Sequence, residues 1–461
     1  MRIYVLPEAT GGALGRMARS SLTRRLLSVC ALLALTACDG AFDFLGSKDP
    51  PPLPGARIAV LVADRSAEAD PRLADLAVRL PRPIPNLSWP QQGGFANHAM
   101  HHLALDDAPA KAWEADIGAA SDDDAPILSG PVVADGRVYA MDADAVVSAV
   151  EAETGRILWS RNITPDEEED GNWGGGIAYD AGRVFAATGF AQVVALDAAT
   201  GEIAWRKSVS GPMRAAPTVF EGRVFVVTKD NRAFALDAVT GDEQWSHSGI
   251  EEVAGLLGAA SPAVDGDTVV VAYSSGEIFA LRVENGRQLW SDNLAAIRRV
   301  DAVSALADIL GRPVVDRGRV YAISHSGRMV AIDAVSGRRL WETALGGTNQ
   351  PWISGDFLFV LTNNGEVACL TARDGLVRWI TPIGQYEDPE DKKGLIDWTG
   401  PVLAGDRLIV SGSHDKALTL SPYTGEILGE IDLPGGAAIA PAIAGKTIYM
   451  LTDEARLVAF R

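Results

Sequence analysis

The chain has very few cysteines: three in 461 residues, at positions 30, 38 and 369. Positions 30 and 38 belong to an N-terminal leader and its end, so the folded body keeps only Cys369. A single cysteine cannot form an intramolecular disulfide, which excludes the disulfide-stapled scaffolds common among small secreted proteins. Cys369 lies in the strand-like run EVACLTA, and this position indicates a buried, unreactive thiol.

Basic residues are also scarce, because 41 Lys and Arg face 60 Asp and Glu and give a net charge of −19. Residues 1–37 hold five arginines and one acidic residue, so the rest of the chain carries −23. Such a body repels nucleic acid, which excludes a nucleic-acid partner. The sequence also lacks a nucleophile elbow, a Ser/His/Asp set and a phosphate-binding loop, so we predict no catalytic residue.

The apolar stretch LLSVCALLAL, residues 26–35, is too short to span a bilayer but suits the hydrophobic region of a secretory signal. It ends in Leu-Thr-Ala-Cys, which resembles the lipobox of bacterial lipoproteins. Residues 1–37 are therefore predicted to be a lipoprotein signal peptide, and Cys38 to be acylated and to anchor the chain to a membrane. The alternative is an ordinary signal peptide that contains a cysteine. A start at Met17 would give the leader a normal length.

Residues 38–56 are Pro-rich and are predicted to form an extended tether. Residues 57–110 show no clear periodicity, and we expect them to pack on or near the main domain. This segment contains His98, His101 and His102, half of all histidines. Metal ligation by these three is an alternative, but no cysteine or clear carboxylate partner completes a set, so no metal site is predicted.

The remaining chain repeats one unit. Eight short turns with glycine join apolar runs, and the glycines are at positions 136, 182, 222, 266, 318, 355, 405 and 445. A second unit, ending in Gly-x-x-x-Trp, has seven glycines, at 155, 201, 241, 286, 337, 375 and 425. Spacings of 37 to 52 residues between the first set, each with about four short strands, are typical of β-propeller blades.

We therefore predict an all-β fold for residues 111–461, an eight-bladed β-propeller of four-stranded antiparallel blades. The chain ends at ARLVAFR, where one more turn and Trp strand should follow. Near the start, AKAWEADIG supplies an isolated strand around Trp113. If that strand completes the last blade, the ring closes and no sheet edge stays open at the closure.

The second unit is illustrated by ALDAATGEIAW, residues 195–205, which predicts a strand, a Thr-Gly turn and a Trp on the outer strand. A large flat side chain repeated once per blade can pack against the neighbouring blade, so we interpret these tryptophans as structural docking residues. Seven of the eleven tryptophans occupy this register: Trp113, Trp159, Trp205, Trp245, Trp290, Trp341 and Trp379. Gly429 replaces Trp in the last copy, and that junction is expected to be the weakest.

The pattern A-x-D-x-x-T-G-x-x-x-W resembles the tryptophan-docking repeat of the quinoprotein-dehydrogenase-like propellers over roughly residues 86–461. One branch contains enzymes that use pyrroloquinoline quinone and typically have a vicinal disulfide, a bound calcium and a catalytic Asp. The other is the BamB family, lipoproteins of the outer-membrane β-barrel assembly (BAM) machinery. No two cysteines are adjacent here, and the lipobox and short blades are similar to the BamB family. The resemblance therefore implies a non-enzymatic scaffold without a cofactor; a quinone-dependent dehydrogenase is the alternative.

The connections from each Trp strand to the next blade should emerge on one face, which is the predicted partner surface. The resemblance implies that this face binds the POTRA domains of BamA, together with other BAM members and unfolded outer-membrane proteins. Leu256 falls where the family has an interface leucine, and Asp308, five residues before Pro313, matches a family aspartate. Leu257 and Leu310 stand where the family has an arginine and a second aspartate. The implied partner-binding residues are Leu256, Leu257, Arg298, Arg299, Asp301 and Asp308.

Two questions stay open at this stage. The resemblance implies the periplasmic face of the outer membrane, whereas Asp39 after the acylated cysteine resembles an inner-membrane retention signal of enteric bacteria. A propeller of the cell envelope with another protein partner is the remaining alternative.

Overall fold

The computed structural model describes residues 67–461 except 123–124, 169–171, 253–254, 296–305 and 438. The leader, Cys38, the tether and residues 57–66 lie outside the described residues. Within the described part, the only helix is the 3-10 turn η1 (Pro71–Leu73), and the other elements are strands. None of its helices has the length and hydropathy that a membrane crossing requires.

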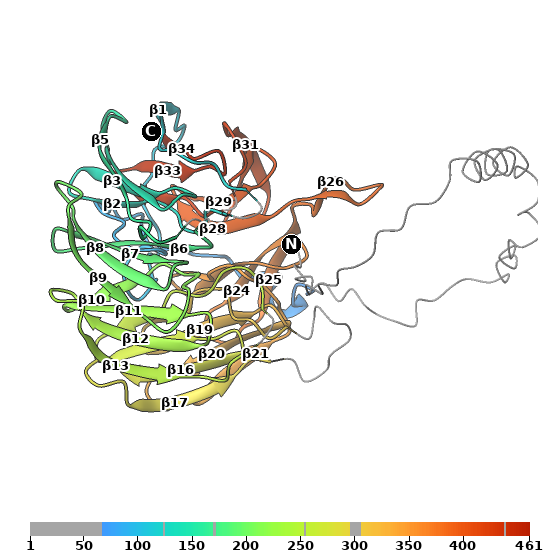
Figure 1. Cartoon of the computed structure of the whole chain (residues 1–461). Coiled ribbons are helices and arrows are strands. Elements are labelled where there is room, and N and C mark those ends of the chain that lie inside the picture. The colour runs from blue at the N-terminus through green and yellow to red at the C-terminus, as the bar shows by residue number, and fades with distance from the viewer. Residues whose placement is uncertain (1–66, 123–124, 169–171, 253–254, 296–305, 438) are drawn as a thin grey trace, which may run out of the picture. The chain divides into compact units, whose positions relative to one another are not determined.

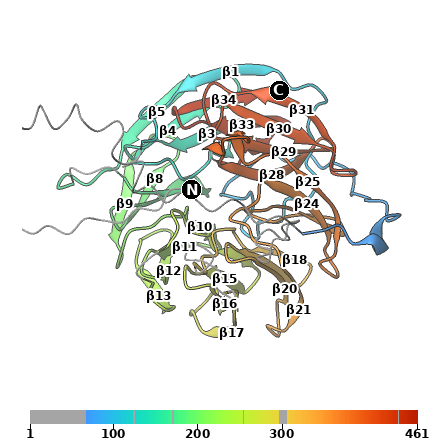
Figure 2. The same ribbon diagram turned by 90° about the vertical axis from the view of Figure 1, so that its right-hand side faces the viewer.

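Eight four-stranded antiparallel sheets stand side by side in a ring (Figures 1 and 2). The first four blades are blade 1, β2 (Val132–Ala134), β3 (Arg137–Met141), β4 (Val146–Glu151) and β5 (Ile157–Asn162); blade 2, β6 (Gly175–Asp180), β7 (Arg183–Thr188), β8 (Gln192–Asp197) and β9 (Ile203–Ser208); blade 3, β10 (Thr218–Phe220), β11 (Arg223–Thr228), β12 (Arg232–Asp237) and β13 (Glu243–Ser248); and blade 4, β14 (Ala263–Asp265), β15 (Thr268–Ala272), β16 (Glu277–Arg282) and β17 (Gln288–Asn293).

The other four are blade 5, β18 (Val314–Asp316), β19 (Arg319–Ser324), β20 (Arg328–Asp333) and β21 (Arg339–Thr343); blade 6, β22 (Trp352–Ser354), β23 (Phe357–Leu361), β24 (Glu366–Thr371) and β25 (Val377–Pro382); blade 7, β28 (Trp398–Ala404), β29 (Arg407–Gly412), β30 (Lys416–Leu420) and β31 (Ile427–Asp432); and blade 8, β32 (Ala442–Ala444), β33 (Thr447–Leu451), β34 (Arg456–Phe460) and β1 (Lys111–Asp116). A small hairpin of β26 (Tyr386–Asp388) and β27 (Lys393–Leu395) projects from the ring between blades 6 and 7 (Figure 1). The predicted eight-bladed propeller is confirmed.

The strand sequences follow from their place in a blade. Inner strands such as β11 are buried along nearly their whole length, because both faces of each sheet are covered by neighbouring blades. Their sequences are accordingly almost continuous runs of Val, Ala, Phe and Leu. Outermost strands such as β13 alternate between exposed and buried positions, with the docking tryptophan turned inward.

Blade 8 closes the ring with both ends of the chain. Strand β1 pairs antiparallel with β34, with Glu114 opposite Val458. At the open end of this pair, Ala110 N–H donates to Arg461 O at 2.6 Å, and Arg461 N–H donates to Ala110 O at 2.9 Å. The predicted closure by the strand around Trp113 is confirmed, and backbone hydrogen bonds hold it where other blades have a covalent turn.

Every docking tryptophan makes the same two contacts with the next blade. Its indole N–H donates to a backbone carbonyl there, at 2.8 to 3.2 Å, and its ring covers the glycine of the Thr/Ser-Gly turn or its equivalent. The donor and acceptor pairs are Trp113–Ala152, Trp159–Ala198, Trp205–Ala238, Trp245–Val283, Trp290–Ala334, Trp341–Ala372 and Trp379–Pro422. All seven thus make the contacts between blades that structural docking would require; that these contacts stabilise the ring stays a prediction.

The junction between blades 7 and 8 differs for a reason that the closure explains. Gly429 occupies the tryptophan position of β31, and a Cβ there would have only Thr419 Oγ1 nearby, at 3.8 Å. The docking turn of blade 8 would lie between β34 and β1, where the two chain ends meet. A tryptophan at position 429 would therefore have no glycine turn to dock on. That this junction is the weakest stays a prediction.

Residues 84–105, which we call the axial segment, bond to the innermost strands of all eight blades in ring order. Those strands line the axis, and their inner edges carry backbone groups that need partners. The contacts, from blade 8 through blades 1 to 7, are Asn86–Ile443, Trp89–Val133, Pro90–Tyr179, Gln91–Val219, Ala96–Val264, Asn97–Val315, His101–Trp352 and Leu103–Leu403. The axial segment therefore contacts every blade.

The three histidines of this segment point to different partners. Nδ1 of His98 lies 2.8 Å from Pro313 O, and burial, aided by the charge of Arg312, lowers the pKa of His98 to about 3. Nε2 of His101 lies 3.4 Å from a carboxylate oxygen of Asp316. Both ring nitrogens of His102 are used, by Pro81 O and Asp406 N–H. These contacts fasten the segment to blade 5, through His98 and His101, and to blade 7, through His102. No group of three metal-binding side chains occurs among the described residues.

Candidate partner-binding face

The connections from each outermost strand to the next blade, and the turns between second and third strands, emerge on one side of the ring, the loop face. The first-to-second and third-to-fourth strand turns lie on the other side, the turn face. The longest connections without strands of their own are 249–262, between blades 3 and 4, and 294–313, between blades 4 and 5. These two loops are adjacent, and they contain all six residues predicted to bind a partner.

The base of the 249–262 loop is held by two polar side chains. Asn231, buried in the β11–β12 turn, donates from its amide to Ile250 O at 2.6 Å and accepts from Ser274 N–H at 3.1 Å. Asn231 has a φ of 55°, which asparagine tolerates better than most residues. Glu277 accepts from Ile250 N–H at 2.7 Å. The loop therefore leaves the ring from a fixed point that joins blades 3 and 4.

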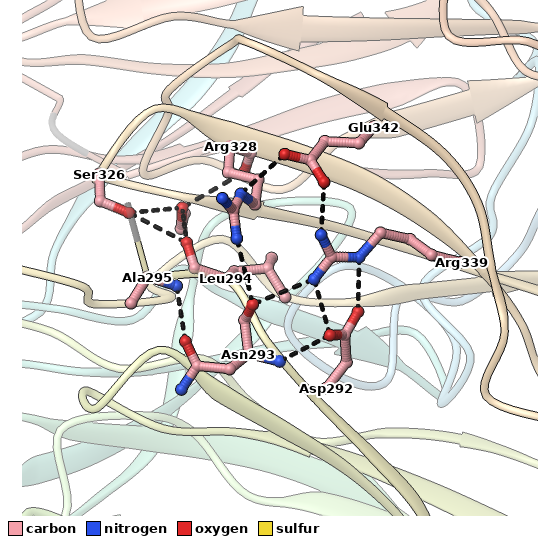
Figure 3. Close-up of polar contacts among 9 residues, drawn as sticks. Asp292, Asn293, Leu294, Ala295, Ser326, Arg328, Arg339 and Glu342 are labelled. Carbon is pink, nitrogen blue, oxygen red and sulfur yellow. Dashed lines mark hydrogen bonds and ion pairs between the residues drawn. The ribbon is translucent and has the colours of Figure 1, made fainter. Parts of the chain in front are cut away.

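The 294–313 loop starts from a network of charged side chains between blades 4 and 5 (Figure 3). The Arg339 guanidinium binds both carboxylate oxygens of Asp292, at 2.6 and 2.8 Å, and also bonds to Glu342. Glu342 in turn pairs with Arg328 at 3.0 Å. Asp292 lies on β17 and its partner Arg339 on β21, so this bidentate pair fixes the end of β17, where the loop begins.

Two serines extend this anchorage into the loop itself. Ser324 and Ser326 hydroxyls both donate to Leu294 O at 3.1 Å (Figure 3). The first residue of the connection is therefore bonded to the β19–β20 turn of the next blade. The last residues are fixed as well, because His325 N–H donates to Asp308 O at 2.9 Å.

The two loops meet at Asp308. Its carboxylate accepts from Leu256 N–H at 3.1 Å, and Arg214, from the connection between blades 2 and 3, lies 3.4 Å from Leu256 O. A Cβ at Gly255 would be only 3.0 Å from the Asp308 carboxylate, so glycine allows the close approach of the two loops. Around this junction is a cavity, lined also by Lys229, Glu252, Tyr273 and Leu310.

The Asp308 carboxyl is in an unusual electrostatic position. Burial raises its pKa to about 6, against the opposing effect of the Leu256 N–H and the Arg214 charge, and nearby Glu252 raises it further. Its second oxygen, Oδ2, is buried without a hydrogen-bond partner. Burial also lowers the pKa of Arg214. The junction thus holds a half-satisfied carboxylate beside a desolvated guanidinium, and both are sensitive to whatever covers the cavity.

The predicted partner-binding residues differ in how far they are exposed to solvent. The side chain of Leu257 is 41% exposed, whereas Leu256 is 9% and Asp308 1% exposed. Leu256 and Asp308 therefore join the two loops, and Leu257 is available to a partner. Arg298, Arg299 and Asp301 lie outside the described residues.

Sequence reasoning missed Arg214 and Asn231. Arg214 lies in a shorter connection without any distinctive pattern, and only its place in the ring, next to the 249–262 loop, could have pointed to it. Asn231 is one of several polar residues in the turns between second and third strands. Neither its burial nor its bonds across two blades leave a signal in the sequence.

The family assignment comes from comparison with known families. The family model described as outer membrane protein assembly factor BamB matches residues 103–170 and 143–381, more than half of the chain. The chain belongs to the BamB family.

Individual BamB proteins are similar over different spans. The outer membrane protein assembly factor BamB of Escherichia coli K12 is 28% identical over 353 residues, which cover 75% of this chain and 87% of that protein. The BamB of Salmonella typhimurium is 32% identical over 257 residues, 54% of this chain and 64% of that protein. The BamB of Legionella pneumophila is 28% identical over 202 residues, and the match spans half of that protein's length.

Solved structures share the fold across both branches of the superfamily. BamB from Moraxella catarrhalis matches with a TM-score of 0.65 at 20% identity, covering 77% of this chain and all of that one. A europium-containing methanol dehydrogenase matches with a TM-score of 0.64 at 16% identity, covering 79% and 89%. Nearly equal scores for BamB and for a dehydrogenase mean that the propeller does not separate the two functions. The family model and the sequence relatives carry the BamB name.

Proposed function

We propose that this BamB-family chain is a non-enzymatic scaffold of the BAM complex, which binds BamA through its loop face and supports the folding and insertion of outer-membrane proteins. The observation that carries the proposal is the union of two loops at one junction, by the Asp308–Leu256 bond at 3.1 Å. A fixed pair of loops on a rigid ring is a preorganised binding surface, which loses little conformational entropy when a partner docks.

The surface around this junction combines apolar and charged groups. Leu257 is 41% and Ile250 59% exposed, and both belong to the 249–262 loop. Arg214, Lys229 and Glu252 line the adjacent cavity. Exposed leucines and isoleucines ringed by charges are typical of a protein-binding patch, in which apolar anchors give affinity and charges give register.

The start of the described chain is compatible with a lipid anchor at Cys38 and a free loop face. Asp70 N–H donates to Val377 O at 2.8 Å, beside the β24–β25 turn, and Pro81 lies against Gly355 in the β22–β23 turn. Both turns are on the turn face of blade 6, with η1 at the rim of the ring (Figure 2). The described chain thus begins away from the loops. We propose attachment to the periplasmic face of the outer membrane, with inner-membrane retention through Asp39 as the alternative outcome.

The test is affinity purification of the full-length chain from mildly solubilised membranes, followed by mass spectrometry. We expect BamA to be recovered with the wild type and to fall at least about tenfold with Leu257→Asp, because a charge buried in an apolar contact costs more than about 1.4 kcal/mol. The matched control is Val335→Asp on the turn face, where the side chain is 88% exposed. This variant should recover BamA like the wild type.

Other results have defined meanings. Equal recovery with Leu257→Asp and Val335→Asp would contradict the loop face as the binding surface. Recovery of no barrel-assembly component, from a chain fractionating with the inner membrane, would contradict the proposed function itself.

A further inference from the structure

The central channel contains a cavity that the proposed function does not use. It lies between the axial segment and the residues at the start of β18, β22, β28 and β32. A concave site lined mostly by apolar side chains with a few polar groups is typical of small-molecule binding.

Arg312 is the only charged residue among those that line this cavity. It is partly buried, and desolvation lowers the pKa of its guanidinium to about 10, with no carboxylate contributing to the shift. Among the described residues, no side chain or backbone group forms a hydrogen bond or ion pair with this guanidinium. Removing a cation from water without a nearby anion costs free energy. The chain has 60 acidic residues, yet none of those described pairs with Arg312.

The other walls of the cavity suit a flat, partly apolar molecule. Trp89 and Trp352 are stacked with ring centres 6.2 Å apart and planes within 15°. Gln350, which is 8% exposed, donates from its amide nitrogen to His98 O, while its Oε1 is buried without a hydrogen-bond partner. The amides of Gln92 and Asn349, in contrast, are fully engaged with backbone groups. Arg312 and the Gln350 carbonyl are therefore the groups left to bind something.

From this arrangement we propose that the axial cavity binds a small organic carboxylate, held by Arg312 and covered by the indole rings of the channel wall. A carboxylate matches the planar fork of a guanidinium with two parallel hydrogen bonds, which a spherical anion cannot do. A flat body beside the carboxylate would lie against indole, and a hydroxyl or amine on it would satisfy Gln350 Oε1. The site is independent of the loop junction at Asp308.

Benzoate is the probe for this proposal, measured on the purified full-length chain by isothermal titration calorimetry and by the shift of the melting temperature. We expect saturable binding to the wild type, weakened at least about tenfold by Arg312→Gln, because the substitution removes the charge-assisted bonds to the carboxylate. Arg312→Lys keeps the charge without the fork and should bind with intermediate affinity. Arg338→Gln, an exposed arginine in the same blade, is the control and should bind like the wild type.

Phosphate and chloride, at matched ionic strength, separate the carboxylate from other anions. Equal binding of benzoate by wild type and Arg312→Gln, or no saturable binding by the wild type, would overturn the proposal. Tight phosphate binding without benzoate binding would overturn the carboxylate assignment as well. Because Leu257→Asp does not touch this cavity, it should leave benzoate binding unchanged, so failure of the partner proposal and of this one can be told apart.

Discussion

A single carboxyl group connects the two loops on which the proposed function depends. Asp308 is almost completely buried, accepts one backbone N–H and leaves its other oxygen without a partner. Its negative charge is useful to the junction, because it attracts Arg214, but it is costly to desolvate. The balance of these effects is visible in its pKa of about 6.

This balance predicts a pH-dependent stability that Asp308→Asn removes. The pKa of Asp308 rises from 3.8 in the unfolded chain to about 6 in the folded one, so between these values the folded state holds the proton more tightly. The contribution of Asp308 to the free energy of unfolding of the wild type therefore falls as pH rises from about 4 to about 6. The fall is roughly 3 kcal/mol, at 1.36 kcal/mol per pKa unit. Asparagine stays neutral and keeps an acceptor for Leu256 N–H.

The measurement is the urea midpoint of both proteins between pH 4 and pH 7. The stability difference should move in favour of Asp308→Asn as pH rises through this range, whereas the exposed control Asp374→Asn should follow the wild type. Parallel curves for wild type and Asp308→Asn would contradict a raised pKa at this site.

At the same scale, the sequence predicted the location of the site better than its chemistry. Leu256 and Asp308 were found through their spacing to the prolines that precede β14 and β18. That spacing cannot show that both side chains turn inward while Leu257 turns outward. Arg214 comes from a blade farther back in the chain and had no signal of its own.

Among the elements, the axial segment is the least periodic and the most widely bonded. The segment passes from blade to blade along the ring, so its sequence follows no strand or helix period. This is why residues 57–110 could not be read beyond packing near the propeller. The blades themselves could be predicted well, because each one repeats the same hairpin turns and the same alternation of apolar residues.

Gln91 offers a test of how much this segment contributes. Its side chain donates to Val219 O at 2.8 Å and accepts from Val219 N–H at 2.7 Å, so it takes the place of a paired strand for blade 3. Gln91→Ala removes both bonds and leaves two buried backbone groups unsatisfied, which should cost about 2–4 kcal/mol of unfolding free energy. Urea unfolding measures the loss, and Gln288→Ala on the exposed part of β17 is the control. Equal small effects of both changes would mean that water replaces Gln91 at the inner strand.

At the scale of the whole molecule, the ring depends on contacts between blades, because among the described strands no backbone ladder joins one blade to the next. The tryptophans were recognised as the source of these contacts from their register alone. The sequence could not show that each ring rests on a glycine of the next blade, since that contact joins residues about 40 positions apart. Glycine is consequently required at this position for two reasons: it adopts the left-handed backbone conformation, and it leaves room for the indole ring that lies on it.

Two glycines of blade 3 separate these requirements. Gly222 and Gly241 have φ values of 73° and 77°, but a Cβ at Gly222 meets nothing within 4 Å, whereas one at Gly241 would be 2.7 Å from the Trp205 ring. Gly222→Ala should therefore cost only the left-handed conformation, about 1–2 kcal/mol. Gly241→Ala should cost about 1–3 kcal/mol more, because the indole must move and its bond to Ala238 O is strained.

Urea unfolding of the two variants, with and without Trp205→Ala, measures the docking contact directly. In the Trp205→Ala background the extra cost of Gly241→Ala should disappear, because the ring that the methyl group meets is gone, and the two alanine variants should then be equally destabilised. If instead Gly241→Ala costs no more than Gly222→Ala in the wild-type background, the indole ring moves freely. The blades would then be held together by the packing of their sheet faces, and the docking tryptophans would not stabilise the ring.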